Sequence, residues 1–300
     1  MAMDNDDDVS AQEQQKKQQQ EEELQRQTEE SPCYSGEDSK VPDERCTASE
    51  HFTKFDPMKY LESFYKTAGE DLAMRVVLFF LPGILYRLPA RIRNMLDLGA
   101  GPTVYLPIAC RERVEKIYTS DYAPANRESL VAYIEKRNPF DWTKVCHWIA
   151  TLEATLESPE KMQEDARVKM QAVLEVNVHA SPVVRGITWK RSQDTEIPQQ
   201  FQLVSTIFCL EYSAENLQEY LRAVKGACSL IEPGGYLLQG GCLDADCYNF
   251  GGKRFSSHRL TKEHVIMGLE ENGMCFDEES ADFKFIVHEE CYLFISKKLQ

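Results

Sequence analysis

Apolar and polar positions along the chain follow two alternating patterns. Short apolar runs, closed by an acid, a glycine or a turn, predict buried strands, and between them apolar residues recur at helical spacing. The runs that predict strands are 92–98, 116–123, 172–178, 200–213 and 232–241. Because strands and helices alternate about five times, we expect an α/β fold with a parallel sheet covered on both faces.

The segments between these strands complete the predicted order of elements. An early helix is expected over 60–79, and Pro82 should then end or kink it. The stretch 140–165 shows no clear period and is predicted to be irregular. The last apolar runs, 283–288 and 291–296, predict an antiparallel hairpin at the sheet edge. Further helices are expected at 103–113, 124–137, 214–231 and 262–271.

Residues 1–50 differ in composition from the rest of the chain. They are rich in Gln and Glu, and they hold fifteen acidic side chains against five basic ones. Since they contain few apolar residues, burial cannot offset chain entropy, and we predict a disordered, solubilising tail. A tail that binds a partner is the alternative. The folded domain is expected to span 51–300.

Composition and charge argue against several classes of protein. The formal net charge is −15, which is unsuited to a nucleic-acid binder with a basic surface. The longest apolar stretch, 76–86, is too short for a membrane span, and the acidic N-terminus does not resemble a secretory signal. We therefore expect a cytosolic protein whose ten cysteines are reduced, without a metal site, because no cysteine pair has zinc-site spacing.

The turn after the strand at 92–98 carries the clearest chemical signal. Gly99 and Gly101 lie in it, and glycines there let the backbone approach a ligand closely. Val104 occupies the position of the third glycine in a dinucleotide fingerprint, so a pyrophosphate is disfavoured. Taken alone, the motif favours a glycine turn that binds nothing over a ligand site.

Two polar residues at later strand ends favour a ligand. Asp121 closes the second strand, where an acid can bind both ribose hydroxyls, and Asn177 closes the third, where an amide can read an adenine edge. A glycine turn, a ribose acid and a third polar residue together predict a nucleoside site without a phosphate clamp. S-adenosylmethionine is such a ligand.

Seven motifs, in order from about residue 50 to the end of the chain, resemble a known family. They are FDPMKYLESFY at 55–65, LDLGAGPTVY at 96–105, SDYAPAN at 120–126, FDW at 140–142, FCLE at 208–211, EPGGYLL at 232–238 and KRFSS at 253–257. The chain is similar to the class I S-adenosylmethionine methyltransferases of small amines, namely the nicotinamide, phenylethanolamine and indolethylamine N-methyltransferases. This resemblance implies a Rossmann-like, mostly parallel seven-stranded sheet with an N-terminal helical lid. We expect a monomer.

The resemblance also implies a cofactor site for S-adenosylmethionine. Its positions comprise two lid tyrosines, the glycine loop, the ribose and adenine contacts and one residue of the fourth strand. They are Tyr60 and Tyr65; Gly99, Gly101, Thr103 and Tyr105; Asp121 and Asn126; Asn177 and Val178; and Ile207. Thr206 is the alternative to Ile207. Methyl transfer is an in-line displacement on a sulfonium, so aligning the reactants and lining the cation with aromatic faces suits the chemistry.

The substrate end of the site is implied by the same resemblance. Glu211 and Asp244 are the catalytic candidates, as partners of a substrate ammonium, and Glu211 matches the acid of phenylethanolamine-type enzymes. Phe208 is expected to stack on the substrate ring. Tyr248 and Ser257 match positions that line the nicotinamide pocket, where Ser257 would meet the carboxamide.

The acceptor is where the motifs conflict. KRFSS and Tyr248 favour nicotinamide or a related pyridine. Gly241 counts against it, because nicotinamide-type enzymes carry an acid there, and Asp244 either substitutes for that acid or is only solvated. The alternative acceptors are an arylalkylamine or a chalcogen compound. A catalytically silent cofactor-binding protein is the alternative outside the enzymes.

Overall fold

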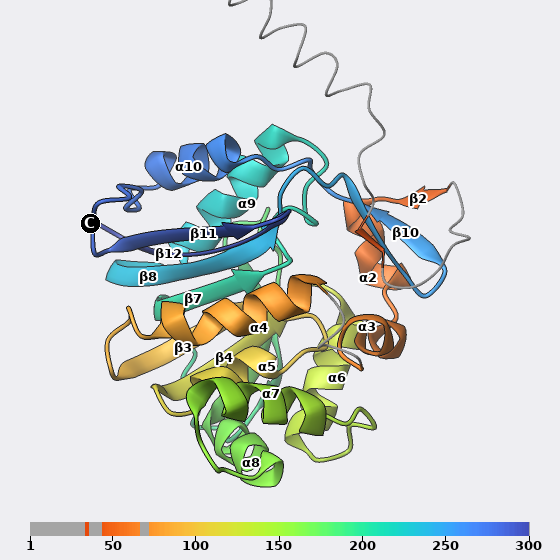
Figure 1. Ribbon diagram of the computed structural model, residues 1–300. Helices are drawn as coiled ribbons and strands as arrows, with labels where there is room; N and C mark the ends of the chain where they lie inside the picture. The colour runs from red at the N-terminus through yellow and green to blue at the C-terminus, as the bar shows by residue number, and fades with distance from the viewer. Residues whose placement is uncertain (1–33, 36–43, 67–71, 300) are drawn as a thin grey trace, which may run out of the picture. The chain divides into compact units, whose positions relative to one another are not determined.

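The computed structural model describes residues 34–35, 44–66 and 72–299. Most of the predicted tail lies outside these ranges, so its disorder stays a prediction. An eight-stranded sheet forms the centre of the fold (Figure 1). In spatial order its strands are β11 (Phe283–His288), β12 (Cys291–Lys297), β8 (Ile231–Cys242), β7 (Phe201–Ile207), β3 (Ile92–Leu98), β4 (Val114–Asp121), β5 (Met170–Val176) and β6 (Val184–Lys190).

The pairing of the strands confirms the predicted fold class. β5, β4, β3, β7 and β8 are parallel to one another, and β12 and β11 form the predicted antiparallel hairpin at the edge beside β8. The sheet has one strand more than the seven expected, because β6 pairs antiparallel with β5 at the other edge. Arg185, Gly186 and Lys190 interrupt the apolar pattern of β6, and none of its residues is fully buried. An edge strand of this kind leaves little signal in the sequence.

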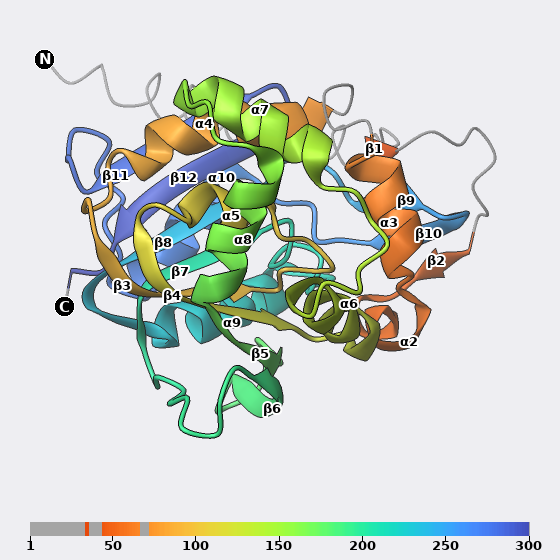
Figure 2. The same ribbon diagram turned by 90° about the horizontal axis from the view of Figure 1, so that it is seen from below.

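Two sets of helices cover the two faces of the sheet (Figures 1 and 2). Successive residues of a strand point to opposite faces, so in β3 Met95 belongs to one apolar core and Leu96 to the other. The first core lies under α4 (Leu72–Leu85), α5 (Tyr105–Cys110), α6 (Pro124–Ile134), α7 (Thr143–Glu153) and α8 (Pro159–Lys169). The second lies under α9 (Leu217–Ser229) and α10 (Lys262–Glu271).

Two expectations about helices were wrong. The stretch 140–165 contains α7 and most of α8 instead of irregular chain, and its apolar residues pack against α4 and α5. α8 buries only Pro159, Met162 and Ala166, so tertiary packing rather than a strong period supports it. The early helix expected over 60–79 is two helices, α3 (Pro57–Phe64) and α4, and α4 continues past Pro82 to Leu85 instead of ending there.

The order of the parallel strands creates a crevice beside β3. The chain continues from β3 to β4 and β5 on one side and to β7 and β8 on the other, so loops diverge at the carboxyl ends of β3 and β7. Gly99 has a φ of +70°, and a Cβ there would lie 2.1 Å from the Sγ of Cys209. Only glycine fits both this backbone conformation and this close approach of the two loops.

A smaller four-stranded sheet holds the N-terminal segment of the described chain. Its order is β1 (Tyr34–Ser35), β9 (Cys247–Phe250), β10 (Lys253–Ser256) and β2 (Arg45–Cys46). After β2 come η1 (Ala48–Glu50), α2 (His51–Lys54) and α3 (Pro57–Phe64). Residues 44–50, which the composition assigns to the tail, therefore contain one strand and one helical turn of this region.

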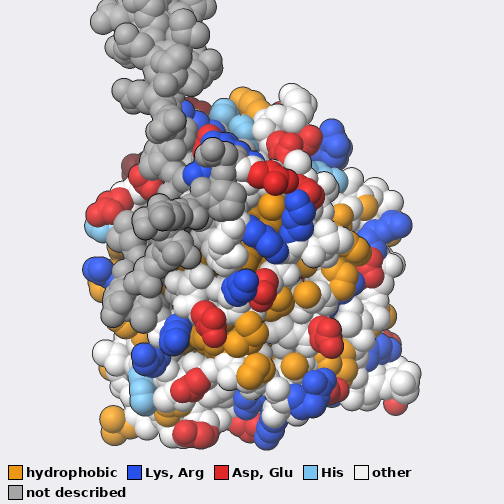
Figure 3. Space-filling view, turned by 90° about the vertical axis from the view of Figure 1, so that its right-hand side faces the viewer, with side chains coloured by type: hydrophobic (Ala, Val, Ile, Leu, Met, Phe, Trp, Pro, Cys, Tyr) orange, Lys and Arg blue, Asp and Glu red, His pale blue; other side chains and the backbone are white. Residues whose placement is uncertain are grey.

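The cysteines differ from expectation at one position. Eight cysteines of the described chain are free thiols, as expected, but Cys247 is disulfide-bonded. Disulfide formation depends on the distance between two backbones, which the spacing along this sequence does not reveal. Within the described part, no helix is long and apolar enough to cross a bilayer. On the face shown in Figure 3, basic and acidic side chains are interspersed.

Candidate active site

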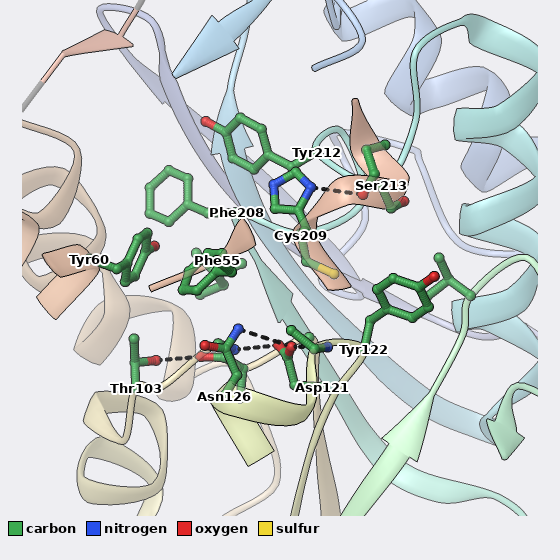
Figure 4. Close-up of a pocket in the computed structure, with 18 of the residues that line it drawn as sticks. Phe55, Tyr60, Thr103, Asp121, Tyr122, Asn126, Phe208, Cys209, Tyr212 and Ser213 are labelled. Atoms are coloured by element: carbon green, nitrogen blue, oxygen red, sulfur yellow. Dashed lines mark hydrogen bonds between the residues drawn. The ribbon is translucent and has the colours of Figure 1, made fainter. Parts of the chain in front are cut away.

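A pocket of about 570 Å³ lies at the carboxyl ends of β3, β4, β5 and β7. Its size is typical of sites that hold a small organic ligand. Aromatic side chains including Phe55, Tyr60 and Phe208 approach it from one side, and polar side chains including Asp121 lie on the other (Figure 4). The lining contains all the predicted cofactor residues, namely Tyr60, Tyr65, Gly99, Gly101, Thr103, Tyr105, Asp121, Asn126, Asn177, Val178 and Ile207, together with Phe208 and Tyr248.

Asp121 holds the polar side of the pocket together. Its Oδ2 accepts a hydrogen bond from the backbone N–H of Gly101 at 2.8 Å. Its Oδ1 accepts from the N–H of Ala123 at 2.8 Å and from the Nδ2 of Asn126 at 3.0 Å (Figure 4). Burial raises the pKa of Asp121, and these three bonds oppose that rise. A carboxylate has about four acceptor positions, so one is left for a ligand hydroxyl.

Several buried polar atoms of the pocket have no protein partner among the described residues. The Oδ1 of Asp97 accepts a hydrogen bond from the Ser205 hydroxyl at 3.1 Å, but its Oδ2 is unpartnered. Burial raises the pKa of Asp97 to about 7. The Oδ1 of Asn126 is unpartnered as well. Thr206, the alternative to Ile207, is not part of the pocket lining. Because unpaired buried polar groups are costly, these atoms favour a polar ligand in the pocket.

Aromatic rings from the N-terminal segment close the other side of the pocket. The N-cap Asp56 and Pro57 start α3, which carries Tyr60. The ring of Tyr60 lies 5.0 Å from that of Phe55 and 6.0 Å from that of Tyr65. Tyr65 in turn lies 5.7 Å from Tyr105, which begins α5. Such rings exclude water and tolerate a cationic ligand centre at low desolvation cost.

The predicted substrate residues lie where this aromatic wall meets β7. Phe208 follows β7 with a φ of +53°, and its backbone N–H donates to the carbonyl of Gly240 at 2.9 Å. Tyr248 in β9 is 5% exposed, and its ring lies 4.4 Å from that of Tyr212. Both Phe208 and Tyr248 line the pocket, as predicted for residues that contact the acceptor.

Glu211 occupies the space beside Gly241. Its side chain is 1% exposed, and its Oε1 accepts a hydrogen bond from the N–H of Cys242 at 3.3 Å. A Cβ on Gly241 would lie 1.9 Å from that Oε1, so the carboxyl fills the volume that a side chain at 241 would need. Its Oε2 is buried without a partner in the described part, and burial raises the pKa of Glu211 to about 8. Glu211 does not line the pocket itself, although its neighbour Tyr212 does.

Two predicted residues lie elsewhere. The side chain of Asp244 is 60% exposed and lies 3.7 Å from the Nε of Arg259, and it is not part of the pocket lining. Ser257 is buried, and its hydroxyl donates to the carbonyl oxygen of Ala245 at 3.0 Å. Ser257 lines a separate small cavity instead of the main pocket. The structure thus places neither Asp244 nor Ser257 in the lining of the main pocket.

The pocket also contains residues that the sequence analysis did not select. Asp97 directly precedes the glycine turn, so its place in LDLGAG was a usable signal. His51 and Phe55 come from the N-terminal segment, and Tyr212 follows Glu211. Phe55 opens the motif FDPMKYLESFY, which was a usable signal, whereas no local pattern marks His51 or Tyr212, which long-range packing brings to the pocket.

Comparisons with known proteins agree with this site. A family model described as NNMT/PNMT/TEMT matches residues 44–299. A nicotinamide N-methyltransferase of Caenorhabditis elegans is 59% identical over 265 residues, which cover 88% of this chain and 97% of the relative. The nicotinamide N-methyltransferase of Homo sapiens is 28% identical over 229 residues, covering 74% and 83% of the two chains. The chain therefore belongs to the NNMT/PNMT/TEMT family, and it is an S-adenosylmethionine-dependent N-methyltransferase.

Proposed function

We propose that the enzyme methylates the ring nitrogen of nicotinamide. The observation that carries this proposal is the continuous pocket, in which the glycine turn and Asp121 lie at one end and the rings of Phe208 and Tyr248 at the other. A ligand pair with a polar nucleoside part and a flat aromatic acceptor suits this arrangement. The 59% identity to a protein named nicotinamide N-methyltransferase supports the choice of acceptor.

The residues of the polar end fit S-adenosylmethionine. Asp121 has one acceptor position for a ribose hydroxyl, and the unpartnered Oδ2 of Asp97 suits the ammonium of the methionine part. Asn126, Asn177 and Val178 would then contact the ribose and the adenine. When bound, the cofactor supplies an electrophilic methyl group on a sulfonium.

The residues of the aromatic end would bind and orient the acceptor. A pyridine nitrogen has a free lone pair at neutral pH, so the protein needs no base and has to align the ring and keep water out. Phe208 and Tyr248 offer ring faces for this purpose, and the lid tyrosines Tyr60 and Tyr65 close the same space. Aromatic rings prefer offset or edge contacts at centroid distances of about 4.5–7 Å, which this cluster already shows.

An arylalkylamine is the second candidate acceptor, and one observation favours it. Glu211 is a buried carboxyl whose pKa is raised to about 8, and its Oε2 has no partner among the described residues. An alkylamine arrives as an ammonium ion and has to lose a proton, and a carboxyl that titrates near neutral pH is suited to accept it. Since Glu211 does not line the pocket, that proton would reach it through an intervening water. The carboxyl fills the space beside Gly241, so Glu211 rather than the exposed Asp244 is the better substitute for the acid missing at that position.

A methyl-transfer screen separates the two candidates. Radiolabelled S-adenosylmethionine would be supplied with nicotinamide, phenylethylamine or tryptamine, and we expect nicotinamide to be the best acceptor. Glu211→Gln should lower turnover of nicotinamide only mildly, and Asp244→Asn serves as the exposed control. If phenylethylamine is methylated instead, and Glu211→Gln lowers that turnover by about 10²–10⁴, the arylalkylamine assignment replaces ours. No transfer to any acceptor would support the catalytically silent alternative.

Location and assembly belong to the same proposal. We propose a cytosolic enzyme that acts as a monomer on small molecules. The free thiols of eight described cysteines suit a reducing compartment, whereas the disulfide at Cys247 does not. Sedimentation of the purified protein with and without S-adenosylhomocysteine would test the monomeric state.

A further inference from the structure

His51 contacts the predicted substrate residue Tyr248 directly. The Nε2 of His51 lies 2.7 Å from the Tyr248 hydroxyl oxygen, and its Nδ1 lies 2.8 Å from the carbonyl oxygen of Ala48. The three residues come from η1, α2 and β9, and all of them line the main pocket. A chain of hydrogen bonds therefore runs from the N-terminal segment to the acceptor end of the site.

The hydrogen-bonding partners of His51 determine where the protons lie in this series of hydrogen bonds. A carbonyl oxygen only accepts hydrogen bonds, so the proton of the imidazole is on Nδ1, facing Ala48. Burial lowers the pKa of His51 to about 4, so the ring is neutral at physiological pH and has a single N–H. The Nε2 is then an acceptor, and the Tyr248 hydroxyl donates to it. Burial also raises the pKa of Tyr248, so the phenol keeps its proton.

The Tyr248 hydroxyl is consequently restricted in what it can offer to a ligand. Its one proton is used by His51, and its oxygen retains lone pairs that accept hydrogen bonds. The ring cannot easily turn away, because it stacks on Phe250 and Phe255 at interplanar angles of 22° and 27°. Packing thus holds the phenol oxygen as an acceptor at this end of the pocket.

The position of His51 is itself fixed from the other side. The backbone N–H of Ala48 donates to the Oε1 of Glu215 at 2.9 Å, and Thr47 and Glu50 form a capping box around the same turn. The imidazole also lies 4.6 Å from the ring of Phe255. The carbonyl that selects the tautomer of His51 is therefore held in place by the fold.

We propose that His51 is a positioning residue that sets the choice of acceptor. By holding the Tyr248 hydroxyl as a hydrogen-bond acceptor, it favours a pyridine that carries an N–H donor, such as a primary carboxamide, over one that carries only a carbonyl. This inference rests on the proposed function, because it concerns which pyridine the same site prefers. It gives the N-terminal segment a role in specificity besides closing the pocket.

A matched pair of acceptors tests the proposal. Nicotinamide and 3-acetylpyridine share the ring and the carbonyl, but only nicotinamide has N–H donors. The quantity measured is the ratio of their kcat/KM values. In His51→Phe the Tyr248 hydroxyl is free to donate, so we expect the preference for nicotinamide to fall by about 2- to 12-fold, mainly through KM. His51→Gln keeps an acceptor and a donor and should restore the preference, whereas His147→Phe, on the exposed side of α7, should leave it unchanged.

A second measurement reads the hydrogen bond without any turnover. Nitrogen NMR of protein labelled in its six histidines, with His51 assigned by its loss in His51→Gln, reports which ring nitrogen carries the proton. We expect the proton on Nδ1, and Tyr248→Phe should shift the Nε2 signal. A proton on Nε2 would overturn the proposal.

The remaining outcomes also decide whether the proposal holds. An unchanged preference in His51→Phe, or an equal loss of both activities, would mean that His51 is merely structural. If the wild-type enzyme methylates neither pyridine, the proposed function fails and the inferred substrate choice fails with it, while the NMR result still establishes the direction of the hydrogen bond. Failure of the inference and failure of the proposed function are therefore distinguishable.

Discussion

Glu211 and the space above Gly241 permit a quantitative prediction. In Gly241→Ala the new Cβ would meet the Oε1, Cδ and Oε2 of Glu211 at 1.9, 2.7 and 3.1 Å. The carboxyl must retreat by roughly 1.5 Å to reach ordinary contact distance. That movement breaks the hydrogen bond from the Cys242 N–H at 3.3 Å and leaves both groups buried and unpaired. Since each of the two unpaired groups costs about 1–3 kcal/mol, we expect Gly241→Ala to lower the free energy of unfolding by about 2–6 kcal/mol.

The cost of the added methyl group should depend on Glu211. In a Glu211→Ala background the space is empty, so Gly241→Ala should cost less than about 1 kcal/mol, and the two changes should be coupled by about 1–5 kcal/mol. Urea unfolding of the four proteins, with an unchanged m-value, measures this coupling. Gly240→Ala is the matched control, because its Cβ would meet Leu293 and the Tyr292 carbonyl rather than Glu211.

Additive effects of the two substitutions on the free energy of unfolding would refute this prediction. If the effects of Gly241→Ala and Glu211→Ala add within about 0.5 kcal/mol, the carboxyl does not occupy the space beside Gly241 in solution. The idea that Glu211 replaces an acid at position 241 would then fail. Gly240→Ala should be equally destabilising in both backgrounds, so a coupling of similar size there would point to a general loosening of β8.

Three further predictions follow from the site. S-adenosylhomocysteine at a hundredfold excess over its Kd should stabilise the protein by about 2.7 kcal/mol, measured as the ligand-induced shift in Tm. Asp121→Ala should lose about 1–3 kcal/mol of this stabilisation. An undiminished shift in Tm would exclude Asp121 from the cofactor site. Because the pKa of Asp97 is raised to about 7, ionisation of its carboxyl lowers the stability of the folded protein as pH rises from about 4 through 7. Asp97→Asn should therefore raise Tm at pH 8 but not at pH 4. Equal changes of Tm at both pH values would contradict this prediction. A chain that starts at Glu50 lacks Ala48 and the two hydrogen bonds that Ala48 forms. Its kcat/KM should therefore be roughly tenfold lower than that of a chain that starts at Glu44. Equal activity of the two chains would show that the turn at Ala48 is dispensable.

The local pattern of the sequence determined the parallel sheet and its glycine turn. Buried strands and covering helices leave periodic apolar runs, and the acid and glycines after β3 mark a ligand turn wherever the rest of the chain lies. α10 begins and ends at the predicted residues, Lys262 and Glu271, because its apolar spacing is clear. The resemblance of the motifs added the residues of the pocket, of which Asp121 and Tyr248 are examples.

Only the tertiary structure decided which acidic and polar residues meet at the acceptor end. Glu211 and Asp244 were both candidates in sequence, but the close approach of the chain at Gly241 buries Glu211 and leaves Asp244 in solvent beside Arg259. Ser257 matched a pocket motif, yet its hydroxyl is used by a backbone carbonyl. Burial and hydrogen-bond partners of this kind depend on chain segments far apart in sequence, which no local spacing records.

His51 illustrates the same limit most clearly. It lies in a short helix next to the predicted tail, without an apolar period or a motif to mark it. Its role in the site comes from contact with Tyr248, which lies 197 residues away along the chain, and from the Ala48 carbonyl that fixes its tautomer. Local pattern determined the sheet and the cofactor turn. Long-range packing decided that the Tyr248 hydroxyl donates its proton to His51, because a hydrogen bond depends on where two atoms meet in space.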